Sequence, residues 1–171
     1  FRTIWWTFLS TGLRHRELVE LHWADIDLDE GTLCVRPEVD KAKRGRHVTV
    51  PFELVERLRK MHQGRADSDF VFVNGIGRPW RNNLLRSFYQ CLRRAGISVD
   101  GSVDLHALRY TYVTALLRAG VNIKVVQELA GHSTLEMTLR VYAQVFRMDR
   151  RAAVERLPWC KETDLKAADA A

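Results

Sequence analysis

Apolar and polar positions in the first half of the chain follow helical and strand-like spacing in turn. Residues 52–62 place Leu54 and Leu58 on one side of a helix. Residues 48–50 alternate as a strand does and stop at Pro51, which has no N–H to continue a ladder. Such patterns predict helices over residues 1–10, 14–22 and 52–62 and strands over residues 32–36, 48–50 and 70–73.

In the second half of the chain every apolar stripe has helical spacing. Helices are expected over residues 82–95, 104–119 and 123–130, followed by one that contains Tyr142. Capping residues mark their predicted starts: Asp104 and Asn122 each precede a stripe, and Ser133 and Glu136 have the spacing of a capping box. The sequence therefore predicts an α+β protein that is mainly α-helical, with a small antiparallel sheet near residues 32–50 and 70–73.

Length and patterning predict one domain. A chain of 171 residues is long enough to bury a proper core. We expect the domain to occupy residues 1–157, and an alanine-rich polar tail to occupy residues 158–171. Because Phe1 opens directly in an apolar, helix-like run without a methionine, we also expect the chain to be a piece of a longer protein.

Composition favours a soluble protein with a polyanionic partner. The chain carries 27 Lys and Arg against 21 Asp and Glu, a net charge of +6, which fits nucleic acid. Its three cysteines form no C-x-x-C motif, so neither a disulfide framework nor a zinc ribbon is indicated, and a reduced, cytoplasmic protein is expected. The apolar run at residues 4–9 is too short to span a bilayer, so no membrane partner is expected.

The sequence predicts no metal site. Residues 25–29 match the first ligands of a calcium-binding loop, but Glu30 stands where that loop needs glycine and Arg36 where it needs glutamate. His106 and His132 lack a third paired ligand for zinc.

Four short motifs carry residue types that suit phosphodiester chemistry. HALR at residues 106–109 places an imidazole and a guanidinium one turn apart on a helix, and GHS at residues 131–133 puts a second imidazole at a helix start. Tyr142 follows that second imidazole by ten residues, and TGLRHREL at residues 11–18 sets another arginine after a glycine turn. Two guanidinium groups neutralise phosphate oxygens and a tyrosine hydroxyl supplies a nucleophile, so this set needs no metal.

In this order and spacing the four motifs resemble the tyrosine recombinase (phage integrase) family, specifically its C-terminal catalytic domain. The resemblance covers nearly the whole chain and implies the fold of that domain. It implies that Arg14 and Arg109 bind the scissile phosphate and that Tyr142 attacks it. His132 is then expected to donate to a nonbridging oxygen, and His106 to accept a proton.

The resemblance also implies a general-acid lysine on a β-hairpin between the two arginines, and two candidates are present. Lys43 stands eight residues before Pro51, a spacing that looks like the family's lysine-to-proline register, and we prefer it. Lys41 is the alternative, since residues two apart in a regular strand point to the same face. Lys41, Arg44 and Arg46 are otherwise expected to contact the DNA backbone.

Other polar residues near the motifs are expected to support the site. Glu17 occupies the acidic position after the first arginine of the family, and it should brace the site through hydrogen bonds to Arg14 or His132 without transferring protons. Tyr110 and Tyr112 follow the HALR motif directly and are expected to pack, not to react.

The function implied by the resemblance is site-specific DNA recombination or integration, as in mobile elements. Tyrosine attack would leave a 3′-phosphotyrosyl bond and a free 5′-hydroxyl, and a 5′-hydroxyl of the partner duplex would reverse the step. No cofactor is therefore expected. The expected partners are double-stranded DNA and, in a full-length protein with a separate N-terminal DNA-binding domain, further copies in a synaptic tetramer; the isolated chain is expected to be a monomer. The alternatives are DNA relaxation of the type IB topoisomerase kind and a non-catalytic DNA-binding module.

The segment after Tyr142 is expected to form an amphipathic helix. Apolar residues recur there at helical spacing and arginines occupy the other faces. The apolar positions are Val141, Val145, Met148 and Ala152 on one line and Phe146, Ala153 and Leu157 on another, and the basic ones are Arg147, Arg150 and Arg151. The resemblance implies docking on a neighbouring protomer, and folding back onto its own domain is the alternative.

Overall fold

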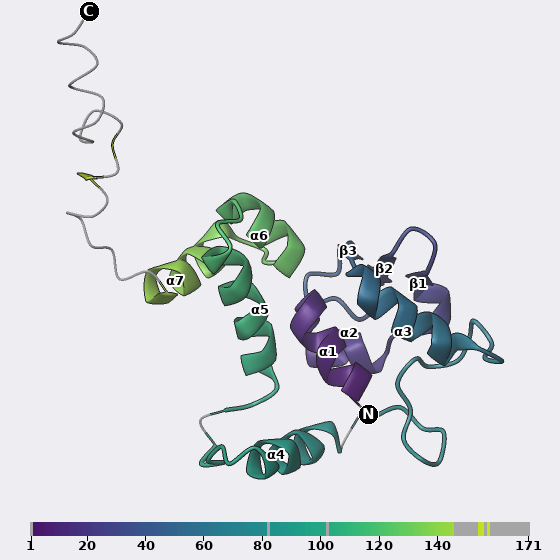
Figure 1. The fold of residues 1–171 in the computed structure, drawn as a ribbon. Helices are drawn as coiled ribbons and strands as arrows, with labels where there is room; N and C mark the ends of the chain where they lie inside the picture. The colour runs from purple at the N-terminus through teal and green to yellow at the C-terminus, as the bar shows by residue number, and fades with distance from the viewer. Residues whose placement is uncertain (1, 82, 102, 146–153, 156, 158–171) are drawn as a thin grey trace, which may run out of the picture.

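The computed structural model describes residues 2–81, 83–101 and 103–145, together with residues 154, 155 and 157 (Figure 1). Within that part of the chain the helices are α1 (Arg2–Thr11), α2 (His15–Val19), α3 (Phe52–His62), α4 (Leu84–Arg94), α5 (His106–Arg118), α6 (Ile123–Ala130) and α7 (Leu135–Val145). A 3₁₀ turn (Trp23–Asp25) leads into the strands β1 (Ile26–Asp27), β2 (Thr32–Val35) and β3 (Arg46–Thr49). The mainly helical α+β prediction is thus confirmed.

The sheet is antiparallel in the order β1-β2-β3, and one of its strands differs from the prediction. Residues 70–73 form isolated bridges at Phe70 and Val73 and are not a strand of this sheet. Their apolar character reflects burial instead, since Val71 and Phe72 lie in the core. The third strand is β1, where the Asp27 carboxylate accepts the N–H groups of the next turn and folds the chain back onto β2. Two residues are too few for alternation to reveal a strand.

Two hydrophobic clusters divide the described part of the fold. The first gathers α1 to α4 and the sheet around fully buried side chains such as Phe8, Leu54 and Leu58. The second lies among α5, α6 and α7 around Val113 and Val126. Since α5 packs against α1 as well as against α6 and α7, residues at the N-terminal end of α5 lie where the two clusters meet.

Two of the three predicted N-terminal caps of helices are confirmed. The Asp104 carboxylate accepts the N–H of His106 at 2.8 Å, and the Asn122 side chain accepts that of Lys124 at 2.8 Å. The expected capping box at α7 is replaced by two other contacts. The Ser133 hydroxyl, expected to accept a backbone N–H, instead donates to the Met137 sulfur, and the Glu136 carboxylate pairs with Arg140 at 2.7 Å.

The expected amphipathic helix after Tyr142 and the tail at residues 158–171 fall mostly outside the described residues. α7 accounts for that segment only as far as Val145. No helix in the described ranges is long and apolar enough to cross a membrane.

Candidate active site

Arg14 is positioned by a sharp turn between α1 and α2. Gly12 has φ +61°, and a Cβ there would overlap the ring of Tyr112, so only glycine fits this turn. Arg14 then forms the N-cap of α2, and its own backbone N–H donates to Glu17 Oε2 at 2.8 Å. Its side chain donates from Nη1 to Glu17 Oε1 at 2.8 Å and from Nη2 to the Gly131 carbonyl at 3.0 Å. Tyr112 packs as expected.

Arg109 is buried at the junction of the two clusters, one turn into α5. Its side chain donates to the carbonyls of Gly12 and Ala130, which stand at the end of α1 and the end of α6. Burial lowers the pKa of Arg109 to about 10, with the nearby charge of Arg14 as the next cause. The guanidinium therefore stays charged at neutral pH while the residue is only 2% exposed.

A buried carboxylate holds two arginines together. Glu17 is 2% exposed and accepts a two-pronged ion pair from Arg46, Nη1 to Oε1 at 3.0 Å and Nη2 to Oε2 at 2.7 Å, besides the bonds from Arg14. Burial acts to raise the pKa of Glu17, yet the hydrogen bonds and charge of Arg46, followed by those of Arg14, bring it to about 2. The expected bracing of Arg14 by Glu17 is therefore present. Asp40 lies beside this group, at 3.4 Å from Arg14 Nη1.

Both predicted histidines are held in the neutral form. Partial burial and the charge of Arg109 lower the pKa of His106, which begins α5. Burial, followed by Arg109 and Arg14, lowers the pKa of His132 to about 4. The His132 Nδ1 lies 2.9 Å from the hydroxyl of Thr138, a fully buried residue of α7. If Nδ1 accepts from that hydroxyl, the Nε2–H is left to donate outward.

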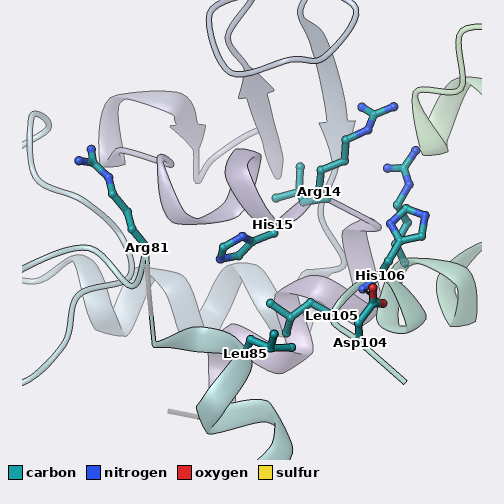
Figure 2. Close-up of a pocket in the computed structure, with 9 residues that line it drawn as sticks. Arg14, His15, Arg81, Leu85, Asp104, Leu105 and His106 are labelled. Atoms are coloured by element: carbon teal, nitrogen blue, oxygen red, sulfur yellow. Dashed lines mark hydrogen bonds between the residues drawn. The ribbon is translucent and has the colours of Figure 1, made fainter. Parts of the chain in front are cut away.

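A cavity of about 440 Å³ brings three of the predicted residues together: Arg14, His106 and Arg109. Figure 2 shows Arg14 and His106 on one side of it and Arg81 on the other. The complete lining is Leu13, Arg14, His15, Arg81, Leu85, Asp104, Leu105, His106 and Arg109. The three arginines therefore bring positive charge to one cavity whose apolar lining consists of leucines.

The sequence patterns do not single out two polar residues of this cavity, His15 and Arg81. Burial lowers the pKa of His15, and Arg81 forms an ion pair with Glu20 at 2.6 Å. The place of His15 directly after Arg14 was an available signal. Nothing in the sequence around Arg81 marks it.

His132 lines a second cavity, of about 350 Å³, between the β2–β3 loop and the start of α7. Arg44, Arg46 and Gly131 line it as well. The two cavities are linked by the hydrogen bond from Arg14 to the Gly131 carbonyl.

Tyr142 and the two lysines lie outside both cavities. Tyr142 is half-buried on α7, where it packs against the second cluster. Lys41 and Lys43 are exposed in the loop at residues 41–45, which is not part of a strand. The two lysines therefore do not share the face of a regular strand. Lys43 has φ +54°, the left-handed conformation that side chains other than glycine rarely adopt.

The side chain of Arg46, a predicted DNA contact, is largely engaged inside the protein. Its side chain is 12% exposed and both of its terminal nitrogens bind Glu17. Among the described residues no group of three or more His, Cys, Asp or Glu side chains is arranged to hold a metal ion.

Comparison with known proteins places this arrangement in a family. The model of the phage integrase family matches residues 2–148. A tyrosine recombinase of Thermosipho africanus is 37% identical over 146 residues, which cover 85% of this chain and 50% of the relative. Tyrosine recombinase XerA of Thermococcus kodakarensis is 34% identical over 148 residues, which cover 86% and 51%. The chain thus spans about half the length of the curated relatives it matches.

Solved structures show the same fold. The Tn1549 transposon integrase, in complex with a circular intermediate DNA, superposes with a TM-score of 0.76 at 25% identity, over 91% of this chain and 58% of that one. The catalytic domain of bacteriophage HP1 integrase superposes with a TM-score of 0.65 at 26% identity, over 91% and 81%. XerA recombinase gives a TM-score of 0.67 at 27% identity, over 87% and 53%.

Proposed function

Given that this chain belongs to the phage integrase family, we propose that residues 1–157 form the catalytic domain of a site-specific tyrosine recombinase. The proposed reaction cleaves one DNA strand and rejoins it to another through a covalent bond between a tyrosine and the DNA. A separate N-terminal DNA-binding domain in the full-length protein would complete the grip on the duplex.

One observation carries the proposal: Arg14 and Arg109 line the same cavity, together with His106. Each guanidinium is fixed by a backbone carbonyl of a distant turn, Arg14 by Gly131 and Arg109 by Gly12. Cations held in place before the substrate arrives stabilise the charge that develops on a pentacoordinate phosphate. Each planar guanidinium also has further N–H donors for phosphate oxygens.

The chemistry follows from the remaining groups. Tyr142 would attack the phosphorus, with the O–P bond to the 5′ oxygen breaking as the phosphotyrosyl bond forms at the 3′ side. His106, held neutral by its lowered pKa, is free to accept the phenol proton. Lys43 would give a proton to the departing 5′ oxygen, and neutral His132 would donate an N–H to a nonbridging oxygen. The reverse sequence joins a new 5′-hydroxyl, so bond energy is retained.

Partners follow from the same proposal. The net charge of +6 suits a duplex as substrate, and the similar Tn1549 transposon integrase was solved in complex with DNA. Strand exchange between two duplexes requires several copies, so we propose a synaptic tetramer for the full-length protein and a monomer for this chain alone. We expect the full-length protein and this chain to act in the reducing environment of the cytoplasm.

Tyr142→Phe tests the proposal directly. Loss of the nucleophilic oxygen should abolish covalent protein–DNA adduct on a nicked suicide substrate, read on a denaturing gel, while DNA binding and the melting temperature stay as in the wild type. Tyr112→Phe is the matched control and should keep the adduct, because Tyr112 packs on Gly12. Undiminished adduct in Tyr142→Phe would place the nucleophile elsewhere. Relaxation of a supercoiled plasmid without paired sites would favour topoisomerase activity instead.

A further inference from the structure

We propose that Arg46 is a positioning residue, which fixes the phosphate-binding Arg14 through the carboxylate of Glu17 and does not itself bind DNA. This inference rests on the proposed function, because it gives Arg46 a task only if Arg14 holds a phosphate. It reverses the expectation from the sequence, in which a basic residue on the hairpin contacts the DNA backbone.

The two arginines meet on a single carboxylate. Glu17 Oε1 accepts Arg14 Nη1 at 2.8 Å and Arg46 Nη1 at 3.0 Å. Glu17 Oε2 accepts the Arg14 backbone N–H at 2.8 Å and Arg46 Nη2 at 2.7 Å. Each oxygen thus takes one bond from each arginine. The carboxylate cannot rotate without breaking bonds to both, so the position of Arg14 depends on Arg46.

The surroundings of Arg46 leave little of its guanidinium for a DNA phosphate. A Cβ placed on Gly131 would lie 2.5 Å from Arg46 Nε, which shows that the side chain passes directly over the backbone of that glycine. Both Nη atoms already bind Glu17, and Asp40 stands 3.7 Å from Nη1. Arg44, two residues earlier in the same loop, is exposed. Arg44 is therefore the residue of this pair that faces solvent.

The same placement joins three separate elements. Arg46 begins β3, Glu17 belongs to α2, and Gly131 ends α6 directly before His132. Arg14 also binds the Gly131 carbonyl, so Arg14 and Arg46 contact the same turn from two directions. A change at Arg46 should therefore disturb the geometry of catalysis without removing a contact to DNA.

Removing Arg46 should also change how Glu17 titrates. Burial alone raises the pKa of Glu17, and Arg46 is the main cause that opposes it. Without Arg46 the pKa of Glu17 rises, so its carboxylate protonates on mild acidification and releases Arg14. In the wild type the pKa of Glu17 is about 2, so its carboxylate stays ionised on mild acidification and keeps holding Arg14. If Arg46 had only a structural role, replacing it would not add a new loss of cleavage activity at acidic pH.

The experiment compares Arg46→Met, Arg46→Lys and Arg44→Met in adduct formation at saturating DNA. We expect Arg46→Met to slow cleavage by about 10- to 100-fold, the range for groups that orient a reactive ligand, with the salt dependence of DNA binding unchanged. Arg46→Lys keeps the charge but not the two-pronged bond, so its rate should fall between wild type and Arg46→Met. Arg44→Met should instead weaken binding and reduce the slope of log K against log salt by about 1.

The pH dependence of cleavage and the titration of Glu17 complete the test, because neither changes merely through a loss of folded protein. Arg46→Met should lose activity as the pH falls, at a pH where the wild type does not, and ¹³C NMR of the Glu17 carboxyl should show the raised pKa without any DNA present. Unchanged rate and pH profile in a folded Arg46→Met, or a reduced salt slope, would overturn the inference. If the wild type forms no adduct, the proposed function fails instead, and the NMR titration still decides whether Arg46 controls Glu17.

Discussion

Two glycine turns hold the arginines of the candidate site, because each turn offers a backbone carbonyl to one arginine. The turn at Gly12 precedes Arg14 and gives its carbonyl to Arg109. The turn at Gly131, with φ +62°, gives its carbonyl to Arg14. Arg109 comes from α5 and also donates to the Ala130 carbonyl beside the second turn, so the two arginines tie the two turns together.

His132 gives a prediction about stability and pH. Folding lowers the pKa of His132 from 6.5 to about 4, so between these values the unfolded chain binds a proton that the folded chain does not. The contribution of His132 to stability is therefore full above pH 6.5 and is lost as the pH drops toward 4. Between pH 7 and pH 4.5, His132→Gln should lose about 2–4 °C less in melting temperature than the wild type, after allowance for the partial exposure of the ring.

The control for this measurement is His47→Gln, since His47 is an exposed histidine on β3. Burial also lowers the pKa of His15 and His106, but both are present in every protein compared, so their effect cancels in the difference. Equal melting losses in His132→Gln and in the wild type would show that His132 does not resist protonation in the folded chain.

At the scale of elements, the loop between β2 and β3 shows where β3 departs from the prediction. The sequence predicts strands over residues 32–36 and 48–50 with the basic run between them; residues 41–45 do form turns, but β3 begins earlier than expected, at Arg46. The Asp40 carboxylate organises the loop by accepting the N–H groups of Ala42 and Arg44. The backbone carbonyl of Asp40 accepts the N–H of Lys43 at 3.1 Å.

Lys43 is held by this loop in a left-handed conformation, and that conformation supports its choice as general acid. A non-glycine residue there costs about 1–2 kcal/mol, a strain that is found mainly at functional positions. Lys43→Asn tolerates the same backbone and removes the ammonium, and it should slow cleavage by roughly 10²–10⁴-fold. A substrate with a 5′-bridging sulfur, whose departure needs little protonation, should restore the rate.

Lys41→Asn is the matched variant from the same loop. It should cleave the ordinary substrate at close to the wild-type rate once DNA is saturating. Rescue of Lys41→Asn by the sulfur substrate, and not of Lys43→Asn, would move the general acid to Lys41. If the sulfur substrate rescues neither variant, both lysines only contact the DNA backbone.

Elements with a strong period were predictable from the sequence, and those fixed by distant partners were not. α3 and α6 begin and end where the apolar stripe and the caps place them. The helix expected over residues 14–22 stops at Val19, and the strand expected over residues 70–73 is buried chain outside the sheet. The partner of Arg46, a carboxylate 29 residues away, leaves no local pattern. For that reason the sequence predicts only a DNA contact for a basic residue on a hairpin, and the ion pair with Glu17 emerges from the structure.

At the scale of the whole described structure, the candidate site lies at the junction of the two hydrophobic clusters. Arg14 and Glu17 come from the first, the Gly131 turn comes from the second, and Arg109 bonds to both sides. A relative shift of the clusters would therefore change the spacing of the two arginines that we propose to bind phosphate.

Residues 146–171 supply the last prediction, because they follow α7 and carry helically spaced apolar positions in the sequence. α7 exposes Leu135, Met137 and Leu139, each by about two fifths of its surface, and these side chains offer an apolar surface to a partner. Deleting residues 146–171 keeps Val145, which packs against the second cluster, so cooperative melting and cleavage of a single site should persist. Assembly on paired sites, seen as a slower band on a native gel, should be lost if the segment docks on a neighbouring copy. If the truncated protein instead loses its cooperative melting transition, the segment belongs to the core of its own domain and docking between copies is wrong.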